Sequence, residues 1–135
     1  MKTGSDRPGV YLLTSGLLLL VLMAACSVVP SQEPQTVWEG GQARVSLEYS
    51  GRVRGVSVVG DFNDWNHNSD PFVKMGGESW RCELDLAPGE YLYLLAIEKD
   101  ESWSLQLDPA NPLRQKIATG RELSLLEVRP RTPGR

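Results

Sequence analysis

The stretch that decides the fold is Val59-Gly60-Asp61-Phe62-Asn63-Asp64-Trp65, which follows the alternating residues 56–58. The alternation predicts a strand, and the heptad predicts the loop at its end. Gly60 permits a backbone conformation that other residues avoid, and the Asn-Asp pair favours a turn. Phe62 is expected to point back into a core. Trp65 is expected at the rim, where an indole on a polar loop suits stacking against the apolar face of a sugar ring.

Strand patterns run through the rest of the chain from residue 36 onward. Apolar and polar residues alternate in segments 43–49 and 80–86, and apolar residues also dominate segments 91–97 and 122–128. No segment has a helical period of useful length. Several short strands separated by Gly and Pro turns predict an all-β fold, an antiparallel β-sandwich of immunoglobulin-like shape.

Size and charge restrict the class of protein. The chain has 135 residues, with 14 Lys and Arg against 17 Asp and Glu, so its net charge is −3. The basic residues are scattered, and we expect no nucleic acid partner. One small domain is predicted over residues 36–129. Residues 130–135 are basic and contain prolines, which predicts a disordered tail; contact with an acidic surface is the alternative.

The N-terminus has the pattern of an export signal. Lys2 and Arg7 precede an apolar run over residues 10–25, which is too short to cross a bilayer comfortably. Its end, Ala24-Ala25-Cys26, resembles a bacterial lipobox, in which the cysteine is acylated and becomes the first mature residue. We therefore predict a cleaved lipoprotein signal peptide at 1–25 and lipidation at Cys26. Ordinary cleavage nearby and an uncleaved anchor helix are the alternatives.

The residues after Cys26 support the same interpretation. Segment 26–35 has two prolines and no period, which predicts a tether. Multiple acyl chains would give lasting attachment to a membrane. If the sorting habits of Gram-negative lipoproteins apply, Ser27 rather than Asp after the cysteine resembles an outer-membrane signal. The predicted location is the bacterial cell envelope, lipid-anchored, at the outer membrane.

An ordered set of motifs resembles one family. This chain has a matching motif at each of five places: residues 60–65, Trp80, residues 86–93, Trp103 and residues 108–109. In the family the same order reads Gly-Asp-Phe-Asn-x-Trp, Trp, Leu-Pro-x-Gly-x-Tyr-x-Tyr, Trp, Asp-Pro. The similarity covers roughly residues 42–129. It is to the glycogen-binding domain of the AMP-activated protein kinase β subunit, to the family 48 carbohydrate-binding modules, and to the early-set domains of isoamylases and branching enzymes.

The resemblance implies a site for an α-glucan or another polysaccharide. Family members hold the sugar with two tryptophans, which correspond to Trp65 and Trp103, and these with Asn63 are the predicted carbohydrate-binding residues. Family members also use a lysine and an asparagine, but those positions fall on Leu94 and near Leu123. Losing two such hydrogen bonds, at about 1 kcal/mol each, weakens a site about tenfold or more. Packing is the alternative role for both tryptophans.

A second function remains open because segment 91–97 is apolar on both faces. Leu92, Leu94 and Ala96 form the second face, which should not be open to water. A loop of the same domain, a second subunit or a partner could cover it. In the last case the domain is a protein-interaction or assembly module, with an envelope protein as partner and these three residues as the interaction face.

We predict no catalytic residue, no metal ligand and no cofactor. His67 is the only histidine and has no cysteine or second histidine at a ligand spacing. The acids of the heptad loop are expected to shape that loop rather than to hydrolyse a glycoside. Cys82 has no partner cysteine if Cys26 is acylated, and its place in an alternating strand predicts a small buried side chain; a reactive or intermolecular thiol is the alternative.

Overall fold

The structure is a computed structural model that describes residue 4 and residues 33–132. The predicted signal peptide, the lipidation site at Cys26 and most of the predicted tether lie outside the described residues, as do residues 133–135. Within the described part, no helix is both long and apolar enough to cross a membrane.

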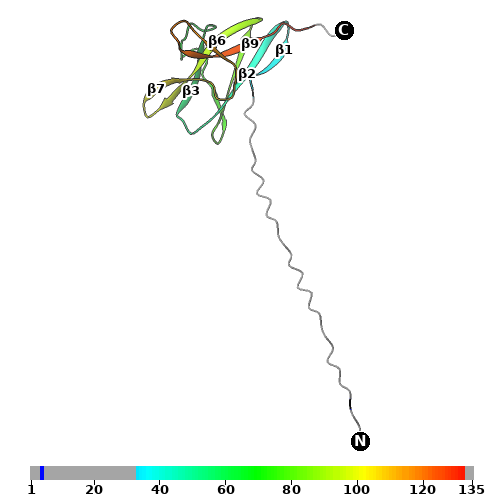
Figure 1. The fold of residues 1–135 in the computed structure, drawn as a ribbon, viewed down its shortest axis with the longest axis vertical. Coiled ribbons are helices and arrows are strands. Elements are labelled where there is room, and N and C mark those ends of the chain that lie inside the picture. Colours follow the sequence, from blue (N-terminus) through cyan, green and yellow to red (C-terminus); the bar gives the residue numbers. More distant parts are fainter. Residues whose placement is uncertain (1–3, 5–32, 133–135) are drawn as a thin grey trace.

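The described chain forms nine strands in two antiparallel sheets (Figure 1). In chain order the strands are β1 (Gln35–Glu39), β2 (Gln42–Ser50), β3 (Gly55–Gly60), β4 (Val73–Gly76), β5 (Ser79–Leu86), β6 (Gly89–Lys99), β7 (Ser102–Gln106), β8 (Arg114–Lys116) and β9 (Glu122–Val128). One sheet has the order β1-β2-β5-β4, and the other has the order β3-β6-β9-β8 with β7 also paired to β6. The predicted all-β sandwich is confirmed. β1 begins at Gln35, the last residue of the predicted tether.

The main core lies between the two sheets and follows from the alternation in the sequence. In β5 every second side chain from Trp80 to Leu86 is buried, while the intervening ones are exposed. β2 also buries alternate residues, with half-buried residues between them, and Val45 lies opposite Leu84 in the register. The other sheet contributes alternate residues of β6, including Tyr93, which is fully buried. Burying one face of each sheet is what holds this sandwich together.

β6 is the exception, because both of its faces are buried at the centre of the strand. Leu94 and Ala96 are 3% and 1% exposed, on the face opposite the main core. They form a second apolar cluster with Val59 and Leu123, and further residues of the same chain pack against it: Leu92, Leu107 and Ile117. The domain's own chain therefore covers this face. In this structure Leu94 and Ala96 of the predicted interaction face are closed to a partner, while Leu92 is partly buried.

A buried polar network holds the segment that covers this face. The Tyr93 hydroxyl donates to Asp108 Oδ2 at 2.7 Å and accepts a bond from Asn111 Nδ2 at 3.0 Å. Asp108 N–H donates to Ser124 Oγ at 2.9 Å, and Arg114 Nη2 donates to the Asp108 carbonyl oxygen at 2.7 Å. Burial and the Asp108 carboxylate raise the pKa of Tyr93 well above its ordinary value. These bonds fix the chain after β7 to both β6 and β9.

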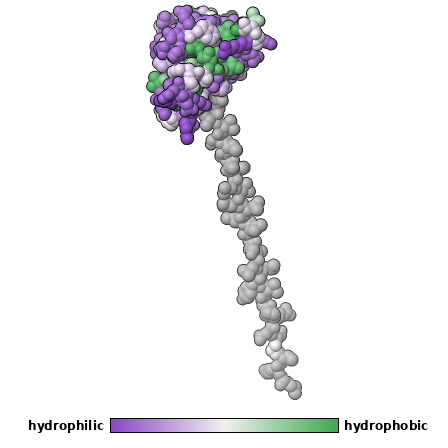
Figure 2. Space-filling view, turned by 90° about the vertical axis from the view of Figure 1, so that its left-hand side faces the viewer, coloured by the Kyte–Doolittle hydropathy of each residue, from purple (hydrophilic) through white to green (hydrophobic). Residues whose placement is uncertain are grey.

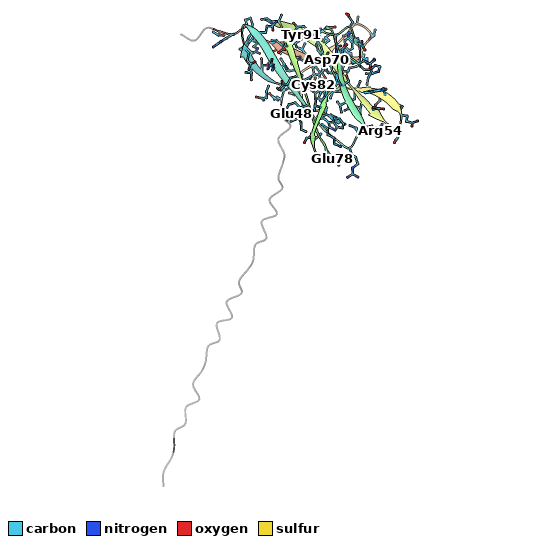
Figure 3. The ribbon with its side chains drawn as sticks, turned by 180° about the vertical axis from the view of Figure 1, so that it is seen from behind. Glu48, Arg54, Asp70, Glu78, Cys82 and Tyr91 are labelled. Carbon is cyan, nitrogen blue, oxygen red and sulfur yellow. The ribbon has the colours of Figure 1, made fainter. Side chains whose placement is uncertain are left out.

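Cys82 is a buried side chain of the main core, as the sequence predicts. It is 6% exposed, and its Sγ lies 3.8 Å from the carbonyl oxygen of Asp70. Burial, with the nearby carboxylates of Asp70 and Glu83, raises the pKa of the thiol to about 12. Figure 3 labels Asp70 and Cys82 close together, in agreement with this contact. A thiol in this state is a poor nucleophile.

Candidate functional site

The loop after β3 is attached to β6 from its first residues. Gly60 is buried, and a Cβ there would lie 2.6 Å from the carbonyl oxygen of Leu92, so only glycine allows the two strands to approach this closely. Asp61 then bonds Leu92 twice: its N–H donates to the Leu92 carbonyl at 3.0 Å, and its carboxylate accepts the Leu92 N–H at 2.9 Å. Phe62 turns inward and meets the Tyr91 ring edge-on, with the ring centroids 6.1 Å apart.

Asn63 is the internal brace of this loop. Its Oδ1 accepts the Gly60 N–H at 3.0 Å, and its Nδ2 donates to the Val58 carbonyl at 2.9 Å and to Asp70 Oδ2 at 2.7 Å. Both amide hydrogens are therefore used inside the domain. Asn63 is a predicted carbohydrate-binding residue, but its donor groups already bind the two ends of its own loop. Its contribution to a site is to hold the residue two positions later in place.

Trp65 follows this brace and is left at the surface. Its side chain is 40% exposed, as the sequence predicts for a rim residue. Asp64 and Trp65 have φ of 53° and 58°, in the left-handed region that L-residues with a side chain seldom adopt. The Trp65 N–H bonds the Gly60 carbonyl at 3.1 Å, which closes the turn around Asn63. The loop thus presents the indole from a backbone conformation that the surrounding bonds enforce.

Trp103 lies on β7 and reaches toward the same loop. It is paired with Glu98 of β6, so its side chain shares a face with Leu94 and Ala96. A Cβ at Gly55 would be 3.5 Å from the Trp103 ring, which places that indole across β6 and over β3. There it packs against the His67 ring, with the centroids 5.0 Å apart and the planes tilted by 43°. One side of the Trp103 indole is therefore occupied, and the side chain is 44% exposed.

The loop that carries Trp65 also contacts Trp103, through His67. Trp65 is two residues from His67, and His67 contacts Trp103. Leu105 extends the apolar character along β7 and is 50% exposed. Figure 2 views the molecule from the side on which β7 lies, and its apolar residues appear there as small patches within a largely hydrophilic surface. This arrangement gives an open surface with aromatic side chains rather than an enclosed cavity.

The strands beside this surface, β6 and β9, carry leucines at the positions where the resemblance implies a lysine and an asparagine. Leu94 and Leu123 are 3% and 6% exposed and belong to the same apolar cluster. Neither has a polar atom to offer a ligand. At these two positions the strands offer no side-chain hydrogen bond to a sugar; the strand residue with a polar side chain beside Trp103 is Glu98 of β6, a carboxylate that only accepts.

Charged groups near this surface are paired or exposed to water. Arg54 Nη1 lies 4.0 Å from Glu101 Oε1, and Figure 3 shows Arg54 beside the hairpin that joins β6 and β7. Among residues 33–132 the structure has no group of three His, Cys, Asp or Glu side chains that could hold a metal ion. No charged group on this surface is buried in the way that catalytic acids and bases usually are.

An antiparallel sandwich with exposed indoles on a surface loop and an adjoining strand has the form of a sugar-binding module. Residues 31–110 match the family model described as carbohydrate-binding module 48, the isoamylase N-terminal domain. The chain belongs to this family. A module of this kind binds carbohydrate and is not catalytic by itself. A search of curated proteins found no match to the chain.

The sequence predicts the exposure of Trp65 and gives both tryptophans as candidate site residues, but it does not predict the parts played by His67 and Gly55. The contact of His67 with Trp103 joins residues 36 positions apart in the chain, so no local pattern reveals it. Gly55 precedes an apolar run and resembles an ordinary strand start. Its missing side chain is what makes room for Trp103 and Glu98.

Proposed function

We propose that this chain is a non-catalytic lipoprotein of the bacterial cell envelope whose domain binds a neutral α-glucan weakly, by stacking on Trp65 and Trp103. The observation that supports the proposal is the half-exposure of two indoles, one on the loop after β3 and one on β7, in a domain of this family. Pyranose rings have apolar faces that stack on indole, and such contacts give affinity without needing a deep pocket.

The chemistry around the indoles supports a neutral ligand. The nearby exposed groups include the acidic side chains Asp64, Asp100 and Glu101. The positive charge of Arg54 is paired with Glu101, since Arg54 Nη1 lies 4.0 Å from Glu101 Oε1. An anionic polysaccharide would meet net negative charge at this surface, whereas an uncharged glucan would not.

Titration calorimetry tests the sugar-binding part of this proposal. The full chain is kept in lauryldimethylamine oxide, since maltoside and glucoside detergents would present the sugars under test. Titration with β-cyclodextrin and maltoheptaose is expected to give saturable heat at millimolar ligand or below. Trp65→Ala should weaken binding at least about tenfold, because a buried aromatic contact carries 1.4 kcal/mol or more.

The control variant is Trp38→Ala. Trp38 lies on β1 and packs against the main core, in the sheet that does not carry Trp65 and Trp103. It should alter stability and leave the affinity for glucan within about twofold. Saturable binding that is the same in Trp65→Ala as in the original chain would refute the proposed site.

The envelope location is the second part of the proposal and has its own test. Its support is the sequence alone: the basic start, the short apolar run and the Ala-Ala-Cys end at Cys26. Cells grown with labelled palmitate should incorporate label into the chain and not into Cys26→Ser. Label in both forms, or in neither, would refute lipidation at this position.

A further inference from the structure

We propose that His67 is the hydrogen-bonding residue of the sugar surface, supplied from the loop after β3 in place of the polar strand residues that this chain lacks. The inference rests on the proposed function, since it needs a sugar on Trp65 and Trp103. In this proposal His67 binds the hydroxyl groups of the sugar, which aromatic stacking does not recognise.

The position of His67 is the first argument. Its ring packs against Trp103 at a centroid distance of 5.0 Å, and it follows Trp65 by two residues. A ligand that stacks on the free side of Trp103 therefore lies close to the imidazole.

The second argument is that the His67 ring is held in place while its nitrogens are unused. The backbone is fixed because the carbonyl oxygen of His67 lies 2.5 Å from the hydroxyl oxygen of Ser57, which is fully buried in β3. Contact with the Trp103 ring limits the rotation of the imidazole. Within the described part of the chain, neither ring nitrogen has a protein hydrogen-bond partner, and the side chain is exposed.

The third argument is chemical. A neutral imidazole has one N–H donor and one nitrogen acceptor, and adjacent hydroxyls of a pyranose offer the complementary acceptor and donor. Leu94 and Leu123 supply neither group, and Glu98 of β6, which lies beside Trp103, supplies acceptors but no donor when it is ionised. Asn63 cannot supply donors either, because both of its amide hydrogens are used within the loop.

Two substitutions at position 67 separate hydrogen bonding from packing. His67→Phe keeps an aromatic ring against Trp103 and removes both nitrogens. His67→Gln keeps a donor and an acceptor and removes the ring. Asn68→Ala is the matched control, because Asn68 is exposed in the same loop and uses only its backbone N–H in a bond to Asn66.

The full chain is titrated with maltoheptaose in lauryldimethylamine oxide, and thermal unfolding is measured in parallel to verify the fold. His67→Phe is expected to weaken binding at least about fivefold, which corresponds to one lost hydrogen bond of about 1 kcal/mol. His67→Gln should lose less than His67→Phe, and Asn68→Ala should bind as the original chain does. In the original chain, the His67 ring protons should shift on addition of sugar in nuclear magnetic resonance spectra.

Two results would overturn the assignment while leaving the proposed function intact. The first is binding by His67→Phe within twofold of the original chain, with Trp65→Ala still impaired. The second is weaker binding by His67→Gln than by His67→Phe, which would make packing on Trp103 the role of the ring. Absence of saturable heat in the original chain would overturn the proposed function and this inference together.

Discussion

Restoring the family's lysine at position 94 should damage this domain instead of improving its site. Leu94 is 3% exposed and packs with Val59, Ala96 and Leu123. Leu94→Lys forfeits most of the burial of a leucine, about 1.5–3 kcal/mol, and must also remove an ammonium group from water or displace the covering residues. We expect a total loss of about 3–5 kcal/mol in the free energy of unfolding. For a domain of this size that lowers Tm by roughly 12 °C or more.

The assay is chemical denaturation of the full chain, with Leu105→Lys as the control. Leu105 lies on the same face of the neighbouring strand but is 50% exposed, so the same change should cost less than about 1 kcal/mol. Affinity for maltoheptaose should not rise in Leu94→Lys. A stable Leu94→Lys domain that binds glucan more tightly would show that position 94 is open to the ligand, and the described cover over β6 would be wrong.

Two further predictions concern the buried polar groups. Tyr93→Phe removes the donor to Asp108 Oδ2 and one of the two acceptors of Asn111 Nδ2 in the interior, and it should cost about 2–4 kcal/mol in the free energy of unfolding. Tyr91→Phe removes a hydroxyl bond that is exposed and should cost under about 1 kcal/mol in the same urea titration. Equal losses would contradict the network. Burial raises the pKa of the Cys82 thiol in the folded state to about 12, from an ordinary value of 9.0. The thiol's contribution to the free energy of unfolding is therefore fully present below about pH 9, and it declines by at most about 1.4 kcal/mol per pH unit up to about pH 12. Cys82→Ala should flatten the alkaline part of the stability profile, and an unchanged slope would contradict the burial of the thiol.

The sequence predicts those parts of the fold that depend on local pattern. Alternation in residues 80–86 predicts β5 and the side of it that faces the core, because successive side chains of a strand point to opposite faces. The heptad predicts the loop after β3 and the exposure of Trp65, because glycine and an Asn-Asp pair favour turns whatever the rest of the chain does.

The rest depends on contacts between distant residues, which no local pattern encodes. What covers Leu94 is an irregular segment after β7, held by the bonds of Asp108 and Asn111, and its side chains have no period to read. Asn63 is of a residue type that often binds sugars, yet its amide group bonds within its own loop, because folding brings Asp70 next to it. His67 gains its place in the site only through the packing of Trp103.

The shared cluster of Leu94 and Leu123 means that these two positions should not vary independently among related chains. They are separated by 29 residues in sequence, yet they contribute to one dry patch. A lysine at one position beside a leucine at the other would leave a charge against an apolar neighbour, and so would the reverse combination. Related chains should therefore fall into two groups, with either a polar pair or an apolar pair at this place, and mixed pairs should be rare.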